Sequence, residues 1–233
     1  MRRPILTRLD EVDEVRGLLV DGAWIRSHLD VDFTNGGHHF TRRYIPRDEV
    51  WVDREAPGAG ELEFLFRHQL RERAFMAEGA PYLKALARAN RLERQERRAA
   101  LDEPSLPIGE ARQRARRHRV GVLDGDALWV VDGRAVRDRF DPNFTGGGHH
   151  WRYRFIPRAE IWIDDAVAER ELDFTVAHEA HELKLMRDGM SYHDAHDRAL
   201  AIERALRRGT YRKIAVVVGA AIALHTRRRR RAI

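Results

Sequence analysis

Histidine and glutamate residues are concentrated in one part of the chain, where their spacing could support metal chemistry. Six of the 12 histidines fall in residues 149–196, and the densest stretch reads HEAHE at 178–182. On a helix that turns about 100° per residue, His178, His181 and Glu182 lie on one face within an arc of about 100°. Apolar residues share this face, so we expect it to point into the protein, where its polar groups need partners.

A bound metal ion is one way to satisfy such groups. Neutral imidazole nitrogens and a carboxylate oxygen suit zinc and other borderline divalent cations. The next predicted helix carries Tyr192 and His196 four residues apart beside small alanines, which allow two helices to pack closely. We therefore expect a divalent-metal site, with zinc as the favoured ion. Its four expected ligands are His178, His181, Glu182 and His196.

Glu179 is the candidate general base for a metal-dependent hydrolase, because a catalytic zinc keeps one position open for a water molecule. If all four side chains bind the metal, the site is closed and structural. The sequence therefore leaves open whether the protein is an enzyme. The spacing also differs from the zincin pattern, whose two histidines are four residues apart, whereas His178 and His181 are three apart.

Metal-free interpretations stay open beside this one. The same side chains could form a hydrogen-bonded buried cluster in a non-enzymatic interaction module, or a solvated histidine face. Two Gly-Gly-His-His runs could complete a site, contact phosphate, or contain ordinary turn residues that hydrogen-bond the fold. The histidines of these runs, whose roles the sequence leaves open, are His38, His39, His149 and His150.

The chain resembles itself at a fixed offset, which predicts a tandem duplication. Residues 20–53 align with 131–164 at 18 of 34 positions, and residues 61–98 align with 171–208 at 15 of 38 positions. Two similar units, or one pseudo-two-fold domain, fit this pattern better than a longer array.

The aligned half provides an internal comparison for the histidine cluster. His68 and Glu72 align with His178 and Glu182, but three neighbours differ. The replacements are Gln69 for Glu179, Arg71 for His181 and Leu86 for His196. Arginine stays protonated and cannot bind a metal; Arg71 could instead pair with Glu72. The metal site is therefore predicted in the second half, and the first half is predicted to hold a degenerate copy.

Turn and periodicity signals predict an α+β fold, in which each unit is a small β-meander followed by a helical hairpin. In the second unit we expect a hairpin turning at Asp132-Gly133, a glycine-rich loop at 145–148, and strands at 151–156 and 160–164. Two helices should follow, from about 169 to 188 and from a Ser191 cap to about 208. The predicted divisions are unit 1 at 1–98, a basic connector at 99–118, unit 2 at 119–209, and an apolar segment with an arginine-rich tail at 210–233.

The block from EIWID to the second helix is similar to uncharacterised bacterial and phage-associated proteins. These proteins carry a HELHE-like helix followed by a YxxAH helix, and the resemblance covers about residues 131–205. The matching residues are His178, Glu179, His181, Glu182, Gly189, Tyr192, Ala195 and His196. The resemblance implies that the histidines act as a unit, and it implies no established activity.

Composition excludes several chemistries. The chain has no cysteine, which excludes disulfides, cysteine-based zinc clusters, iron–sulfur sites and a thiol nucleophile. It shows no phosphate-loop pattern, dinucleotide fingerprint or nucleophile elbow. No signal-peptide pattern opens the chain, so a cytoplasmic protein is expected.

The net charge of +6 comes from a basic connector and a basic tail around an acidic body. These segments could bind nucleic acid or anionic lipid weakly and without sequence specificity. The tail residues expected to do so are Arg227, Arg228, Arg229, Arg230 and Arg231. The apolar run at 214–224 is shorter than the roughly 20 residues that a transmembrane helix needs, so no span is predicted.

Overall fold

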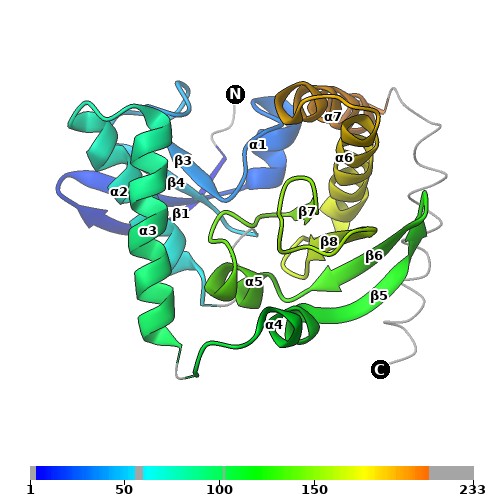
Figure 1. Ribbon diagram of the computed structural model, residues 1–233. Coiled ribbons are helices and arrows are strands. Elements are labelled where there is room, and N and C mark those ends of the chain that lie inside the picture. The colour runs from blue at the N-terminus through cyan, green and yellow to red at the C-terminus, as the bar shows by residue number, and fades with distance from the viewer. Residues whose placement is uncertain (1–3, 56–59, 102, 210–233) are drawn as a thin grey trace, which may run out of the picture. The chain divides into compact units, whose positions relative to one another are not determined.

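The computed structural model describes residues 4–55, 60–101 and 103–209 (Figure 1). The chain divides into two compact units, one made of Met1–Ser105 and Val136–Asn143 and the other of Leu106–Ala135 and Phe144–Ile233. Two four-stranded sheets are each followed by helices. The predicted α+β class is therefore confirmed, and the duplication and the pseudo-two-fold relation stay predictions. The predicted β-meander is wrong, because the two central strands of each sheet are parallel and are not consecutive in the chain.

In the first unit the sheet has the strand order β1-β2-β4-β3. Strands β2 and β4 are parallel, and the other neighbours are antiparallel. The elements are β1 (Ile5–Val12), β2 (Val15–Val20), α1 (Gly22–His28), β3 (Gly36–His38), β4 (Glu49–Asp53), α2 (Leu62–Ala77) and α3 (Tyr82–Ala100).

The sheet of the second unit has the same type of order, β5-β6-β8-β7, again with its two central strands parallel. The elements along this part of the chain are α4 (Ile108–Ala115), β5 (Arg116–Leu123), β6 (Asp126–Val131), α5 (Gly133–Arg139), β7 (Gly147–His149), β8 (Glu160–Asp164), α6 (Glu169–Arg187) and α7 (Tyr192–Arg207). The later part of α5 belongs to the first unit, because that unit includes Val136–Asn143.

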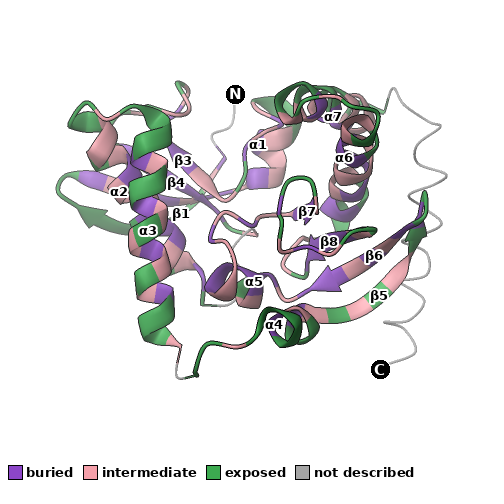
Figure 2. Cartoon of the chain, in the orientation of Figure 1, coloured by how far each residue is buried: buried purple, intermediate pink, exposed green. Residues whose placement is uncertain are grey.

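Apolar packing between β8 and α6 sets the position of the helix that carries HEAHE. Ile161 and Ile163 of β8 form a buried cluster with Val176 and Leu183 of α6, and Figure 2 shows β8 almost wholly buried. On the same strand, the buried Trp162 donates its indole N–H to Glu160 Oε2 at 2.7 Å. The face of α6 that does not meet the sheet is left for contact with α7.

Helices α6 and α7 lie side by side (Figure 1), joined by a short turn. Gly189 has φ +92°, a left-handed conformation that ends α6 at little steric cost. Ser191 then caps α7, since its side chain accepts a hydrogen bond from the Asp194 N–H. Ala195 and Ala199 are both fully buried, as the expected close packing of the hairpin requires.

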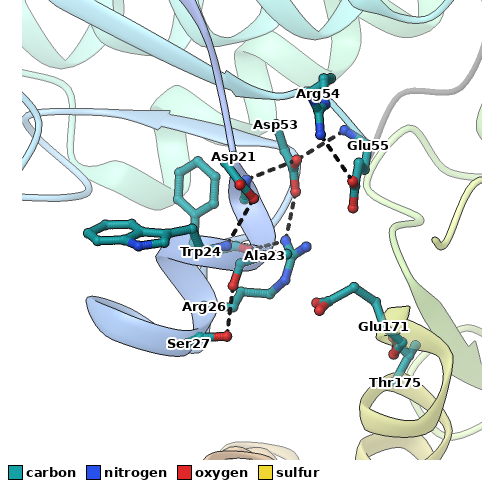
Figure 3. A network of polar contacts seen from close by, with 12 residues as sticks. Asp21, Ala23, Trp24, Arg26, Ser27, Asp53, Arg54, Glu55, Glu171 and Thr175 are labelled. Carbon is teal, nitrogen blue, oxygen red and sulfur yellow. Dashed lines mark hydrogen bonds and ion pairs between the residues drawn. The ribbon is translucent and has the colours of Figure 1, made fainter. Parts of the chain in front are cut away.

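Two aspartates, the half-buried Asp21 and the buried Asp53, organise the start of α1 in the first unit (Figure 3). Asp21 caps the helix by accepting from the Trp24 N–H at 3.0 Å. Asp53, at the end of β4, accepts from the Gly22 N–H at 3.2 Å and from Arg26 at 2.7 Å. A Cβ on Gly22 would lie 1.8 Å from an Asp53 oxygen, so this close approach requires glycine.

Three local predictions are wrong. Residues 151–156 form turns, because Arg152 and Tyr153 both donate their N–H groups to the His149 carbonyl. The strand-like pattern came from Trp151, Tyr153 and Phe155 at alternate positions, but in the turns Trp151 is exposed, while Tyr153 and Ile156 are buried. The expected loop at 145–148 contains the start of the short strand β7, because Gly147 and Gly148 pair with β8.

The hairpin turn was also placed wrongly. Asp132 accepts from the Ala135 N–H at 2.8 Å and so caps α5. The true turn between β5 and β6 is Asp124-Gly125, where both residues have positive φ, 50° and 90°. This is the Asp-Gly pair that a tight hairpin favours.

A buried cluster of charges holds α3 in the first unit. Arg97 is 1% exposed and its two terminal nitrogens each lie 2.9 Å from one oxygen of Glu61, which is fully buried. Arg137, from the part of α5 in this unit, also donates to Glu61 at 2.6 Å. Asp138 accepts from Arg97 at 2.8 Å. Each buried charge is therefore paired with an opposite one.

We predict that Glu61→Gln destabilises the protein strongly, because it leaves two buried guanidinium groups without their shared carboxylate. The free energy of unfolding should fall by about 3–5 kcal/mol in urea titrations followed by circular dichroism. The matched control is Glu63→Gln, which removes an exposed carboxylate two residues along the same helix and should cost less than about 1 kcal/mol. Equal effects of the two substitutions would contradict this account of the cluster.

Candidate metal centre

Three side chains of the second unit converge as the ligands of a metal ion would. His178 and Glu182 lie one turn apart on α6, and His196 faces them from α7. His196 Nδ1 is 2.8 Å from Glu182 Oε2 and 3.2 Å from His178 Nε2, and His178 Nε2 is 3.6 Å from Glu182 Oε2. In a tetrahedral zinc site with bonds of about 2.0–2.1 Å, neighbouring ligand atoms are about 3.3 Å apart. The three donor atoms therefore have the spacing of a metal-binding group.

Outer partners hold two of these side chains in place. His178 Nδ1 lies 3.1 Å from Glu203 Oε2, so this nitrogen donates to the carboxylate and Nε2 faces the cluster. His149 Nε2 lies 2.9 Å from Glu182 Oε1 and leaves Oε2 to the other two histidines. A carboxylate behind a histidine is the arrangement that commonly orients a metal ligand.

The charge network continues from Glu203 to the C-terminal part of α7. Arg207 donates to Glu203 Oε1 at 2.7 Å and binds both oxygens of Glu171, at 3.0 and 2.7 Å. Arg207 thus balances the two carboxylates that lie behind the cluster, and the helix hairpin is crosslinked along its length.

Glu179 forms a second group with His149 and Glu182, in which one donor atom from each lies within 4.8 Å of the others. No hydrogen-bond partner of the Glu179 carboxyl is present among residues 4–55, 60–101 and 103–209. Burial and the nearby charge of Glu182 raise the pKa of Glu179. The carboxyl is therefore a better proton acceptor than an ordinary surface glutamate.

His181 is in neither group. Burial and the positive charge of Lys184 lower its pKa, and no ligand atom of the cluster is hydrogen-bonded to it in the described part of the chain. The structure therefore brings together three of the four expected ligands, His178, Glu182 and His196, and leaves the fourth apart.

Hydrogen bonds determine the charges of two members of the cluster. Burial would lower the pKa of His178, but hydrogen bonds to Glu182 and Glu203 outweigh it and raise the pKa to about 10. Burial would raise the pKa of Glu182, but hydrogen bonds from His149, His178 and His196 bring it well below its usual range. A negative carboxylate thus lies beside a positive imidazolium, and a divalent cation could supply the positive charge in place of the proton of His178.

The aligned residues of the first unit keep the frame of this cluster. His38 Nε2 lies 3.1 Å from Glu72 Oε1, and His68 bonds Glu93 through Nδ1 at 2.7 Å while its Nε2 lies 3.5 Å from Glu72 Oε2. Leu86 stands where the second unit has His196, so one donor is missing. The first unit therefore has the supporting contacts of the cluster with one metal ligand fewer.

The pairing of Arg71 was predicted wrongly. Arg71 binds both oxygens of Glu96 on α3, at 2.8 and 2.5 Å, in place of Glu72. The carboxylate of Glu72 instead contacts His38 and His68. Arg71 therefore does not fill the space that a metal would occupy.

In each Gly-Gly-His-His run, the first histidine hydrogen-bonds the buried glutamate of its unit and the second does not. His38 and His149, each fully buried at the end of a short strand, bond the glutamate of their own unit. His39 and His150 follow them, and burial lowers the pKa of both. Sequence reasoning left the role of His149 open and missed that of Glu203. These residues lie 33 positions from Glu182 and 25 from His178, and only the fold brings them close.

One sequence signal could have found the ligand pair. Zinc peptidases of the HExxH type use residues four apart on a helix as ligands, with the glutamate after the first histidine as base. The segment from 178 to 182 reads His-Glu-Ala-His-Glu, so Glu182 occupies the position of the second histidine of that pattern. The spacing fits once a carboxylate is accepted as the second ligand.

Comparison with protein-family models, with curated proteins and with solved structures finds no match to this chain. The resemblance to proteins with a HELHE-like helix therefore stays a prediction. Within the described residues, no helix is long and apolar enough to cross a membrane. The apolar run at 214–224 and the arginines at 227–231 lie outside those residues.

We predict a pH dependence of stability to which His68 of the first unit contributes. Burial alone would lower the pKa of His68, but hydrogen bonds to Glu72 and Glu93 raise it from 6.5 to about 9. The protonated form is favoured in the folded state, so its contribution is complete below pH 6.5 and is lost as the pH rises to about 9. The loss should be about 1–3 kcal/mol in urea titrations across this window.

Two variants check the origin of this effect. His68→Gln should reduce the slope of the unfolding free energy against pH, because one linked proton is removed, and the slope that remains belongs to His178. His193→Gln, which changes an exposed histidine on α7, should keep the slope of the parent protein. An unchanged slope in the His68 variant would show that His68 does not contribute to the effect.

Proposed function

We propose that the second unit binds one divalent cation, with zinc favoured by the donor set, and uses it to hydrolyse a substrate. The ligand atoms are His178 Nε2, Glu182 Oε2 and His196 Nδ1. The observation that carries the proposal is their mutual spacing of 2.8, 3.2 and 3.6 Å. His181 is omitted from the ligand set because it belongs to neither converging group.

The difference between the two halves supports this assignment. The aligned cluster of the first unit retains the His–Glu contacts but has Leu86 for His196 and Gln69 for Glu179. Its replacements therefore remove one ligand and the candidate base, while they leave the supporting contacts in place. A purely structural cluster has no need of these two side chains, since the first unit is built without them.

His178, Glu182 and His196 would hold the cation and leave a fourth tetrahedral position open, as in catalytic zinc sites. A zinc ion there would supply a water of lowered pKa and would polarise a carbonyl oxygen. Glu179, whose pKa is raised by burial and by Glu182, would take a proton from a water molecule and return it to the leaving group of the substrate. The reaction class is hydrolysis of an ester or amide.

A metal-free structural role is the second candidate, and the first unit favours it. His68, Glu72 and Glu93 form a hydrogen-bonded network there without a third ligand. In this case the second unit would be an interaction module whose histidines only stabilise the helix hairpin. The metal content of the protein separates the two candidates.

Association with nucleic acid or anionic lipid through the basic segments stays a prediction. Its proposed carriers, Arg227 to Arg231, lie outside the described residues. Binding of this kind would fall steeply with salt, because it comes from charge neutralisation.

We predict that His196→Leu, which copies Leu86, abolishes metal binding. Protein purified without an affinity tag and dialysed should contain about one zinc per chain, and the variant less than about a tenth of that, by mass spectrometry of the metal. His181→Ala and His193→Leu are the controls and should keep the parent metal content. A parent protein without metal, or a His196→Leu variant that retains it, would refute the site.

We also predict that Glu179→Gln, which copies Gln69, separates binding from chemistry. The variant should keep its zinc but lose metal-dependent hydrolysis of p-nitrophenyl acetate by about 100-fold or more, because an amide cannot take the proton. Glu169→Gln, at the exposed start of the same helix, should leave the rate unchanged. A Glu179 variant with the parent rate would remove this residue from the mechanism.

A further inference from the structure

Tyr192 lies against the candidate metal site without belonging to its ligand set. It is the first residue of α7, one turn before His196, and the two rings stack with centroids 5.6 Å apart and planes at 24°. The tyrosine ring therefore covers one side of a ligand. Its hydroxyl makes a hydrogen bond with the Arg152 side chain, which a phenylalanine could not make.

The charges of the site act on this hydroxyl. Burial raises the pKa of Tyr192, and the charges of Glu182 and Glu179 raise it further, while the charge of Arg152 and a hydrogen bond with it act in the opposite direction. Tyr192 thus interacts with both carboxylates of the site and with a cation.

Arg152 accompanies the tyrosine. Its guanidinium carbon lies 5.0 Å from the centroid of the Tyr192 ring and 4.8 Å from that of Tyr153. It follows β7 by three residues, in the turn whose N–H groups bond the His149 carbonyl. The strand that supplies His149 therefore also positions a positive charge at the site.

The first unit lacks this arrangement. Tyr82 aligns with Tyr192 but is 46% exposed, and Thr41 and Leu86 stand at the positions of Arg152 and His196. The aligned positions therefore combine a tyrosine with this arginine and this histidine in the second unit alone.

We propose that Tyr192 donates a hydrogen bond to the oxygen of a metal-bound acyl group and that Arg152 stabilises the negative charge which develops there. This inference rests on the proposed function and names its substrate class, a carboxylic ester or amide. A positioned donor and a nearby cation, aimed at the oxygen that gains charge, are the usual means of stabilising a tetrahedral intermediate. Tyr192 is then a catalytic residue and Arg152 supports it.

The test uses acetohydroxamate, which binds a metal through two oxygens, as a probe of the full-length protein loaded with cobalt. Binding is followed through the visible absorption of the cobalt ion. Tyr192→Phe keeps the ring stacked on His196 and removes only the donor, so it should retain cobalt and bind acetohydroxamate about tenfold more weakly. Arg152→Gln should also weaken the binding of acetohydroxamate. Tyr82→Phe, the matched control, should leave that binding unchanged.

Each other outcome contradicts the proposal in a recognisable way. Probe affinity within about twofold of the parent in Tyr192→Phe would show that the hydroxyl does not contact the bound oxygen. Loss of cobalt in that variant would make Tyr192 a support of the metal site alone. A parent protein that takes up no cobalt would refute the proposed function itself, before any probe is added.

Discussion

A buried carboxylate keeps its negative charge only where donors surround it, and in the second unit Glu182 meets this condition through three histidines. These come from β7, α6 and α7, so one side chain joins the edge of the sheet to both arms of the helix hairpin. The apolar contacts of α6 with β8 bring the elements together. The carboxylate then determines which rotation and register of the elements satisfy its oxygens, because an unpaired oxygen at 2% exposure is costly.

The supporting charges are arranged in alternation. A series of contacts runs from His149 through Glu182, His178 and Glu203 to Arg207, and each contact joins a basic side chain to a carboxylate. The first unit has the same sequence of types, from His38 through Glu72, His68 and Glu93 to Arg97. Replacing one member of this series leaves its neighbours unpaired. Substitutions are therefore tolerated mainly at residues that contact the series without belonging to it. Gln69 and Leu86 are changes of that kind, because neither position belongs to the series itself.

The helical parts of the site could be predicted from the sequence, and the parts contributed by distant segments could not. Periodicity correctly placed His178 and Glu182 on one inward face, and the buried alanines of α7 brought His196 to them. The position of His181 was harder to predict. A helix face about 100° wide includes residues whose side chains reach the cluster and residues at the edge of the face whose side chains do not. Glu203 and His149 depend on the hairpin and on strand pairing, which local patterns do not encode. The turns at 151–156 were mistaken for a strand because aromatic residues alternate with arginines there, and this pattern does not reveal that Trp151 is exposed.

The frame that the two units share has a consequence for how the second unit would acquire the proposed cation. A zinc finger has no fold before its metal arrives, whereas here the packing of α6 on β8 and the hydrogen bonds of the cluster already hold His178, Glu182 and His196 close together. Folding of the helix hairpin would then not depend on the cation. The cation would compete with protons for these side chains, so its occupancy would follow both the supply of metal and the acidity of the surroundings.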